Sequence, residues 1–134
     1  MTTDPTKPNE FPNVVITEKP VTDTAIQFVK TFYVAYTDLE TGELYTGDFT
    51  CRRLNQIQVL QYGAEKARLV SGMPVDGGFD FLATMLAYLN VTFTIKPGWW
   101  KPEQLYDVSA IRALYDYVRA WESSFRRPAV AQRL

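Results

Sequence analysis

The chain has 134 residues with no histidine and one cysteine, which excludes Ser-His-Asp and Cys-His nucleophile systems and ordinary zinc sites. Its formal net charge of -1 provides no basic excess for binding nucleic acid. The hydrophobic content of 46% and aromatic content of 14% predict one folded domain whose core needs no disulfides. We therefore expect neither an enzyme nor a cofactor or metal site.

Neither a signal peptide nor a membrane span is expected. The N-terminus is polar and lacks the apolar region of a signal peptide. The longest uncharged apolar stretch, residues 81–95, falls short of the roughly 20 residues that cross a bilayer. The sequence therefore predicts a soluble protein made in the cytoplasm.

Residues 1–25 differ from the rest of the chain. They hold four of the eight prolines among polar side chains, which predicts an extended or disordered N-terminal arm. Within this arm Val14, Val15 and Ile16 are β-prone and could add as a strand to an exposed sheet edge. Two interpretations stay open: a loose tail, or an arm that is ordered on a neighbouring subunit. The second makes these three residues interface candidates.

A β-hairpin is expected next. Residues 28–36 and 43–52 are rich in β-branched and aromatic side chains. The connection between them starts at Asp38 and ends at Gly42, which fits a type I turn that closes into a glycine bulge. The side chains expected to face the core are Phe32, Val34, Tyr45 and Phe49.

Two helices should follow the hairpin. Asn55 can cap the first, which runs to about Val70. The second begins near Phe79 or Asp80, and its end is open, because residues 91–95 fit either a short strand or the last helical turn. The first helix is indicated by apolar residues that recur at helical spacing: Ile57, Leu60, Ala64 and Ala67.

The third helix has the clearest periodic pattern. Asp107 can cap it, and five large apolar side chains follow at spacings of 3, 4, 3 and 4. Such a stripe forms either the core or a subunit seam, so its last two members, Trp121 and Phe125, are interface candidates. The stripe consists of Ile111, Leu114, Val118, Trp121 and Phe125.

Two features resemble chemical sites, and both have a simpler interpretation. Cys51 has no histidine to activate it and lies in a predicted strand, which indicates a small buried hydrophobe. Residues 76–80 resemble part of a calcium loop but lack the full set of oxygen ligands. A glycine turn leading to Asp80 as a helix N-cap accounts for them. No metal ligand or catalytic residue is assigned.

The loop at residues 96–102 carries two adjacent tryptophans, Trp99 and Trp100, between prolines. Large aromatic side chains usually bury most of their surface, so a small satellite core is one interpretation. A contact anchor is the other, because tryptophan is enriched at interface hot spots. Since adjacent residues rarely both face inward, we expect one of the pair inside and the other available to a partner.

Several short stretches from the hairpin onwards carry a resemblance to a known group of proteins. They are GDFT at 47–50 leading into Arg53-Leu54, FLATMLA at 81–87, PGWW at 97–100, Leu105-Tyr106-Asp107, and WESSFR at 121–126. Over about residues 28–126 the chain resembles small proteins encoded among the structural and assembly genes of tailed bacteriophages. Such proteins include tail assembly chaperones, head decoration or cement proteins, and head–tail connection proteins. The resemblance implies function through protein–protein contact and no catalysis.

Together these features predict an α+β domain over residues 26–128, with the arm before it and a tail at 129–134. The hairpin, with a third strand if residues 91–95 are extended, would pack against two or three helices. The hypothesis is a non-enzymatic virion protein of a tailed bacteriophage, of the decoration, cement or connector type. Its partners would be other capsid or tail subunits and could include further copies of itself, with no nucleic acid or membrane. The alternatives are a soluble tail assembly chaperone, and a small-ligand-binding protein or carboxylate-dependent enzyme.

Overall fold

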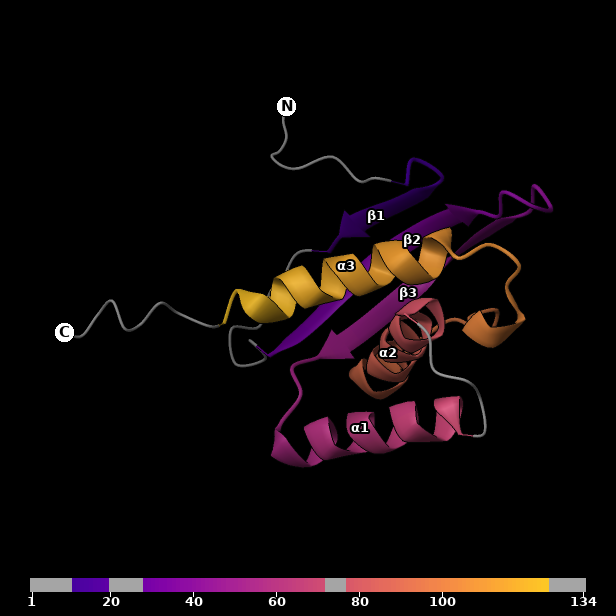
Figure 1. The fold of residues 1–134 in the computed structure, drawn as a ribbon. Coiled ribbons are helices and arrows are strands. Elements are labelled where there is room, and N and C mark those ends of the chain that lie inside the picture. The colour runs from indigo at the N-terminus through magenta and orange to yellow at the C-terminus, as the bar shows by residue number, and fades with distance from the viewer. Residues whose placement is uncertain (1–10, 20–27, 72–76, 126–134) are drawn as a thin grey trace.

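The computed structural model describes residues 11–19, 28–71 and 77–125, and it confirms the predicted α+β fold. A four-stranded antiparallel sheet is combined with three α-helices (Figure 1). The elements in chain order are β1 (Val14–Glu18), β2 (Val29–Thr37), β3 (Leu44–Arg52), α1 (Gln56–Val70), α2 (Gly77–Thr92), β4 (Phe93–Ile95), the 3-10 turn η1 (Pro102–Gln104) and α3 (Ser109–Ser123).

The sheet has the strand order β1-β2-β3-β4, and its centre is the predicted hairpin. Strands β2 and β3 pair from Val29 opposite Arg52 to Thr37 opposite Leu44. Their connection closes at Gly42, whose φ of 79° lies in the left-handed region that glycine adopts without steric cost. The hairpin prediction is therefore confirmed to within one residue at each strand.

Alternate residues of the hairpin point into the core. Phe32, Val34 and Phe49 are fully buried, as the sequence predicts, whereas Tyr45 is half-buried at the margin of the core. Phe32 and Phe49 lie opposite each other in the register, and their ring centroids are 5.7 Å apart. The hairpin thus provides one wall of the hydrophobic core.

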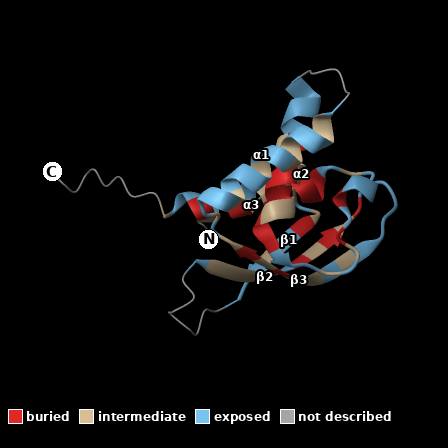
Figure 2. Ribbon diagram, turned by 90° about the horizontal axis from the view of Figure 1, so that it is seen from below, coloured by how far each residue is buried: buried red, intermediate tan, exposed pale blue. Residues whose placement is uncertain are grey.

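Helices α2 and α3 provide the other wall. Both lie over the same face of the sheet, and Figure 2 shows their buried residues gathered where they meet the strands. The predicted apolar stripe of α3 is confirmed in its first three members, because Ile111, Leu114 and Val118 are buried. Its last two members, Trp121 and Phe125, are half-buried and pack at the margin of the core.

The junction between α2 and β4 combines the two structures that the sequence left open. The helix continues to Thr92, and Phe93 begins a short strand that pairs with β3, placing Phe93 opposite Cys51. The start of α2 differs from the prediction, because the helix begins at Gly77. Asp80 therefore lies in the first turn and is not the N-cap.

The N-terminal arm is the main correction to the sequence analysis. Residues 14–18 do not form a free arm but are strand β1 of the chain's own sheet, paired with β2. The β-prone pattern was read correctly as a strand, but its partner edge belongs to the same chain. Residues 1–10 and 20–25 of the predicted arm and the C-terminal tail at 129–134 lie outside the described residues.

Helix α1 is held at the edge of the domain. The predicted cap is confirmed, because the Asn55 side chain accepts from the Gln58 N–H at 2.9 Å and the Gln58 side chain accepts from the Asn55 N–H. The helix packs chiefly against α2, and none of its residues is buried. In Figure 2 it is therefore free of the red that marks the core elements.

Candidate interaction surface

The interface candidates in β1 divide between the two faces of the sheet. Val14 is 1% exposed and belongs to the core, and Ile16 is half-buried against it. Val15 points to the opposite face and is 55% exposed. Two of the three residues are therefore used by the chain's own fold, and of the three only Val15 is exposed to solvent.

The tryptophan pair is split as the sequence predicts, with Trp100 buried and Trp99 half-exposed. Trp99 nevertheless packs on its own domain. Its ring lies 5.1 Å from that of Tyr45, and its indole N–H donates to the Thr46 carbonyl at 2.9 Å. This loop therefore closes over β3, and the satellite-core interpretation describes it better than a free anchor does.

Trp121 and Phe125 also pack within the domain, at the C-terminal end of α3. Their rings are 5.3 Å apart, and Phe125 lies 5.4 Å from Phe28 at the start of β2. The Arg53 guanidinium lies over both phenyl rings, 5.5 Å from the Phe28 centroid and 4.9 Å from the Phe125 centroid. Phe28 remains 45% exposed, so this cluster is only partly covered.

The ionisable groups that lie inside the domain have structural roles. Cys51 is fully buried, and this burial raises the pKa of its thiol to about 12, which keeps it protonated and unreactive. Glu122 accepts from the Tyr88 hydroxyl at 2.7 Å and from the Leu54 N–H at 3.1 Å, joining α2, α3 and the start of α1. Within the described ranges, no group of three or more potential metal-ligating side chains is present.

The best-organised surface lies at the tip of the hairpin, where Asp38 fixes the turn. Its carboxylate accepts from the N–H groups of Glu40 at 2.7 Å and Thr41 at 3.1 Å. The Tyr36 hydroxyl donates to the same carboxylate at 3.1 Å. Burial, followed by this hydrogen bond, raises the pKa of Tyr36 above its ordinary value. The turn is therefore rigid, with Leu39 held at its apex.

A second carboxylate, Asp107, joins this turn to the loop before α3. It accepts from the Leu39 N–H at 2.9 Å and from the Ser109 N–H at 2.9 Å. Although partial burial acts to raise it, these donors hold the pKa of Asp107 below its ordinary value. Asn13 completes the network by donating to the Ser109 hydroxyl at 2.8 Å and the Thr37 carbonyl at 2.9 Å. Four segments of the chain are thereby fixed relative to one another.

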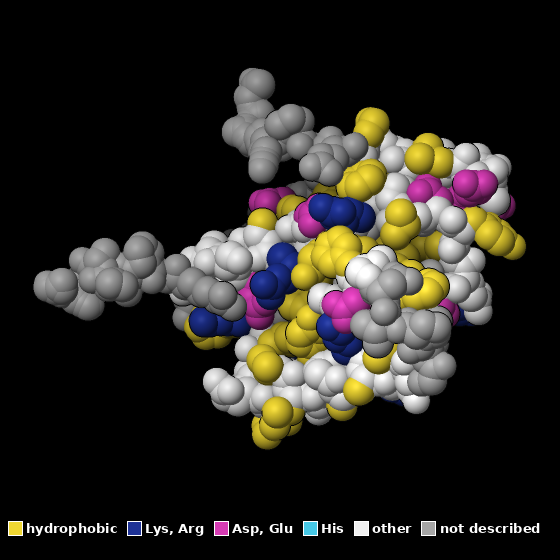
Figure 3. All heavy atoms as spheres, in the orientation of Figure 1, with side chains coloured by type: hydrophobic (Ala, Val, Ile, Leu, Met, Phe, Trp, Pro, Cys, Tyr) yellow, Lys and Arg dark blue, Asp and Glu magenta, His cyan; other side chains and the backbone are white. Residues whose placement is uncertain are grey.

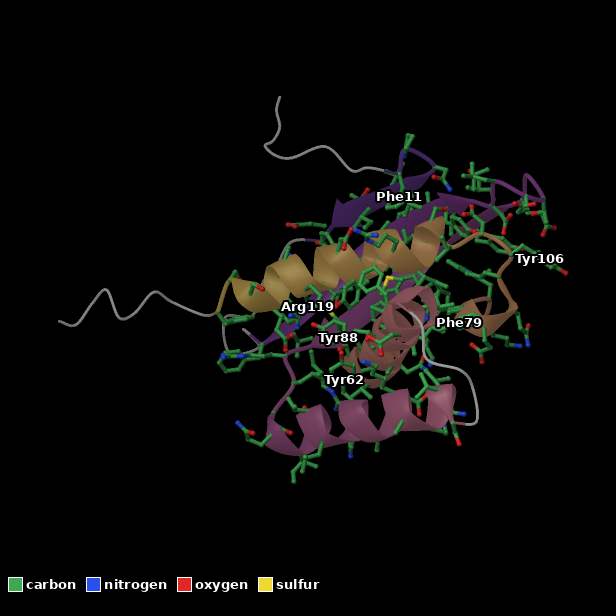
Figure 4. All side chains as sticks on the ribbon, in the orientation of Figure 1. Phe11, Tyr62, Phe79, Tyr88, Tyr106 and Arg119 are labelled. Carbon is green, nitrogen blue, oxygen red and sulfur yellow. The ribbon has the colours of Figure 1, made fainter. Side chains whose placement is uncertain are left out.

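This network presents a set of large apolar side chains to solvent, which we call the tip patch. Because Asp107 holds the Leu39 backbone, the residues on either side of Asp107 lie next to the hairpin turn. Tyr106 points away from the body of the domain (Figure 4). The members of the tip patch and their exposed fractions are Leu39 at 67%, Leu44 at 64%, Tyr106 at 80% and Val108 at 50%.

Acidic side chains border the tip patch. Glu40 and Glu43 are exposed in the turn itself, and Asp107 lies between two members of the patch. Figure 3 shows hydrophobic and acidic side chains side by side at the right-hand end of the molecule, where Figure 1 places the hairpin tip. The surface therefore combines an apolar centre with a negative rim, a composition typical of a protein contact.

The tip patch could not be predicted from the sequence. Its members come from two segments more than sixty positions apart, and they follow no helical or strand period. The available signal was local: Leu39 stands in a turn between Asp38 and Glu40, where a polar residue would be expected. A turn that exposes a leucine is a place to look for a contact.

Comparisons place no relative beside this chain. No protein-family model, no curated protein and no solved structure matches it. Among the residues that the structure describes, no helix is long and apolar enough to pass through a lipid bilayer. The features that bear on function are therefore the tip patch and the resemblance in the sequence.

Proposed function

We propose that this chain is a non-enzymatic structural or assembly protein of a tailed bacteriophage virion, of the decoration, cement or connector type. The observation that carries the proposal is the tip patch, four exposed apolar side chains held in place by a rigid hydrogen-bond network. The resemblance over residues 28–126 supplies the class of protein. The function is contact with a neighbouring subunit.

The composition of the tip patch indicates the kind of neighbour it fits. An apolar centre gains affinity from aliphatic or aromatic side chains, and a rim of Glu40, Glu43 and Asp107 favours lysine or arginine around them. Rim charges act mainly on the association rate and on the choice of partner. The proposed partner surface is thus an apolar patch flanked by basic side chains on a capsid or tail subunit.

The roles of three hydrogen-bonded carboxylates favour this function over the carboxylate-dependent enzyme. Asp38, Asp107 and Glu122 each accept hydrogen bonds from backbone N–H groups of their own chain. A general acid or base must reach a substrate with its carboxylate, and these three are occupied in holding turns and helix ends. The hydrogen bonds of each carboxylate therefore explain its presence by a structural role.

One finding makes a tail assembly chaperone fit the structure almost as well as a virion protein does. A long free arm would favour a lattice component, but residues 14–18 belong to the chain's own sheet. Residues 14–18 therefore give no reason to prefer a virion protein over a chaperone that leaves before the particle is complete. Both functions use the tip patch, and they differ in whether the chain stays in the particle.

Quantitative mass spectrometry on density-purified particles tests the proposal. A virion protein is expected in the particles, at high copy number for a decoration protein and at low copy number for a connector. Presence in the lysate with absence from the particles would overturn the virion role in favour of the chaperone.

A matched pair of variants then tests the tip patch itself. Tyr106→Glu, at the most exposed member, should abolish incorporation or assembly. Ile95→Glu, at a residue that is 60% exposed on β4, should leave it intact. Equal incorporation of both variants would show that the tip patch is not the contact.

A further inference from the structure

Helix α1 faces the domain with its more polar side. Tyr62 points toward Tyr88 of α2, with ring centroids 5.9 Å apart (Figure 4). Two polar contacts also join α1 to α2: the Asn90 amide donates to Glu65 at 3.0 Å, and Lys66 forms an ion pair with Asp80 at 3.0 Å. An amphipathic helix normally buries its apolar side, but in this orientation none of the described parts of the chain buries the apolar side of α1.

The opposite side, which we call the outer α1 face, consists of Ile57, Leu60, Gly63, Ala64 and Ala67. All five are exposed, Ile57 by 62% and Leu60 by 70%. Four of them follow one another at spacings of 3, 4 and 3, the a/d pattern by which two helices pack along a seam. In the isolated chain this seam faces solvent.

Gly63 is a second, independent sign that something approaches this face. Glycine in the middle of a helix costs roughly 1 kcal/mol relative to alanine. A Cβ at position 63 would meet no atom within 4 Å, so the chain's own packing does not require a glycine there. A small residue beside an exposed seam allows the backbone of another helix to come close.

We propose that the outer α1 face pairs with the same face of a second copy, with the two helices antiparallel about a two-fold axis near position 62. In this register each large side chain meets a small one: Ile57 lies opposite Ala67 of the second copy, and Leu60 lies opposite its Ala64. The two-fold axis repeats both contacts. The face is therefore complementary to itself, as an isologous interface requires.

The charges of α1 also favour an identical partner. Arg68 is paired with Glu65 at 2.6 Å and Lys66 with Asp80, so the charged groups of the helix are neutralised within one chain. The seam residues carry no charge, and the first turn has no acidic residue. A strongly charged partner would leave its own charges unmatched, whereas a second uncharged face leaves none. Antiparallel pairing also aligns the helix dipoles favourably.

The length of the outer α1 face limits the affinity of the pairing. The fifteen residues of α1 form a helix about 22 Å long. One face of such a short helix buries less surface than a standard protein interface does. The pairing should therefore be reversible and dependent on protein concentration. In a particle, where many copies are held close together, such a weak contact is strengthened by multivalency. This inference goes beyond the proposed function, because it concerns the purified chain alone.

Sedimentation equilibrium over a range of concentrations tests the pairing. The wild-type chain should approach twice the monomer mass as its concentration rises. Leu60→Glu, which places a charge on each side of the axis, should stay monomeric at every concentration while its far-ultraviolet circular dichroism shows a folded protein. Leu39→Glu is the matched control, since Leu39 is similarly exposed but lies in the tip patch. A monomeric wild type, or loss of the dimer only in Leu39→Glu, would overturn the assignment.

Disulfide cross-linking tests the register. A mixture of Leu60→Cys and Ala64→Cys chains should form a mixed disulfide readily, because these positions lie opposite each other. Ile57→Cys alone should not cross-link, because antiparallel pairing separates the two copies of position 57 by about 15 Å along the axis. The native Cys51 is buried and does not compete. Rapid cross-linking of Ile57→Cys without the mixed product would show a parallel pair and overturn the proposed register.

Discussion

Gly47 in β3 shows how one missing side chain shapes the loop that carries the two tryptophans. A Cβ at this position would lie 2.6 Å from the Pro97 Cβ, 2.8 Å from its Cγ and 3.3 Å from the Trp99 Nε1. A real Cβ atom essentially never lies within 3.0 Å of such an atom, so the two distances to Pro97 exclude a side chain at residue 47 unless the proline moves. The loop from Pro97 to Trp99 can therefore lie across the strand only because residue 47 is a glycine.

Gly47→Ala should consequently destabilise the protein, by about 1–3 kcal/mol, because the rigid proline ring must move. Gly63→Ala is the matched control, since the space around that position is open and alanine favours the helix by up to about 1 kcal/mol. Urea denaturation in dilute solution measures both free energies of unfolding. A Gly47→Ala protein as stable as the wild type would show that the loop does not pack on β3.

At the scale of elements, strand β1 contributes to the stability of the domain. Its five residues pair with β2 from Val14 opposite Tyr36 to Glu18 opposite Phe32. The Val14 side chain enters the core, and the Tyr117 hydroxyl of α3 donates to Glu18 at 3.0 Å. The strand is thus anchored to both the sheet and a helix, and removing it would expose core residues.

Neighbouring valines in β1 give a direct test. Val14→Ala should lower the free energy of unfolding by about 2 kcal/mol, from two lost carbons and the cavity that they leave. Val15→Ala, at a residue 55% exposed on the other face, should change it by less than about 0.5 kcal/mol. Thermal and urea denaturation measure the difference between the two variants. Equal small effects would mean that β1 is detached from the domain in solution.

Elements with strong local sequence signals could be predicted, but the surfaces against which they pack could not. The hairpin carries its own turn chemistry at Asp38 and Gly42, and α3 carries a regular apolar stripe. A pattern gives the period of an element but not the surface that covers it. For this reason the β-prone pattern of residues 14–18 leaves open which sheet edge the strand joins, and the apolar spacing of α1 gives no sign that its apolar side faces solvent. The tip patch combines distant segments and had no pattern at all.

At the scale of the whole molecule, the core encloses several weak acids in their protonated forms. Burial raises the pKa of Cys51 to about 12. Burial, followed by hydrogen bonds to carboxylates, also raises the pKa of Tyr36, Tyr88 and Tyr117 well above the ordinary tyrosine value. The carboxylate partners are Asp38, Glu122 and Glu18 respectively. Each acid holds its proton more tightly in the folded chain than in the unfolded chain.

These shifts predict that the protein loses stability in alkali. A raised pKa contributes stability that is fully present below the unfolded-state pKa, about 9 for Cys51 and about 10 for tyrosine. As the pH rises above these values the unfolded chain loses protons first, so the free energy of unfolding falls. Urea denaturation should therefore give similar free energies near neutral pH and at about pH 8, and a much lower one at about pH 11.

Tyr88→Phe separates this linkage from general alkaline damage. The variant loses the hydrogen bond to Glu122, which lowers its stability at neutral pH by about 1–2 kcal/mol. It also loses one of the four acids whose pKa is raised, so its free energy of unfolding should decline less steeply between about pH 9 and pH 12 than that of the wild type. Parallel declines would show that Tyr88 does not contribute to the pH dependence. A flat wild-type profile would mean that the core admits solvent and does not hold these protons.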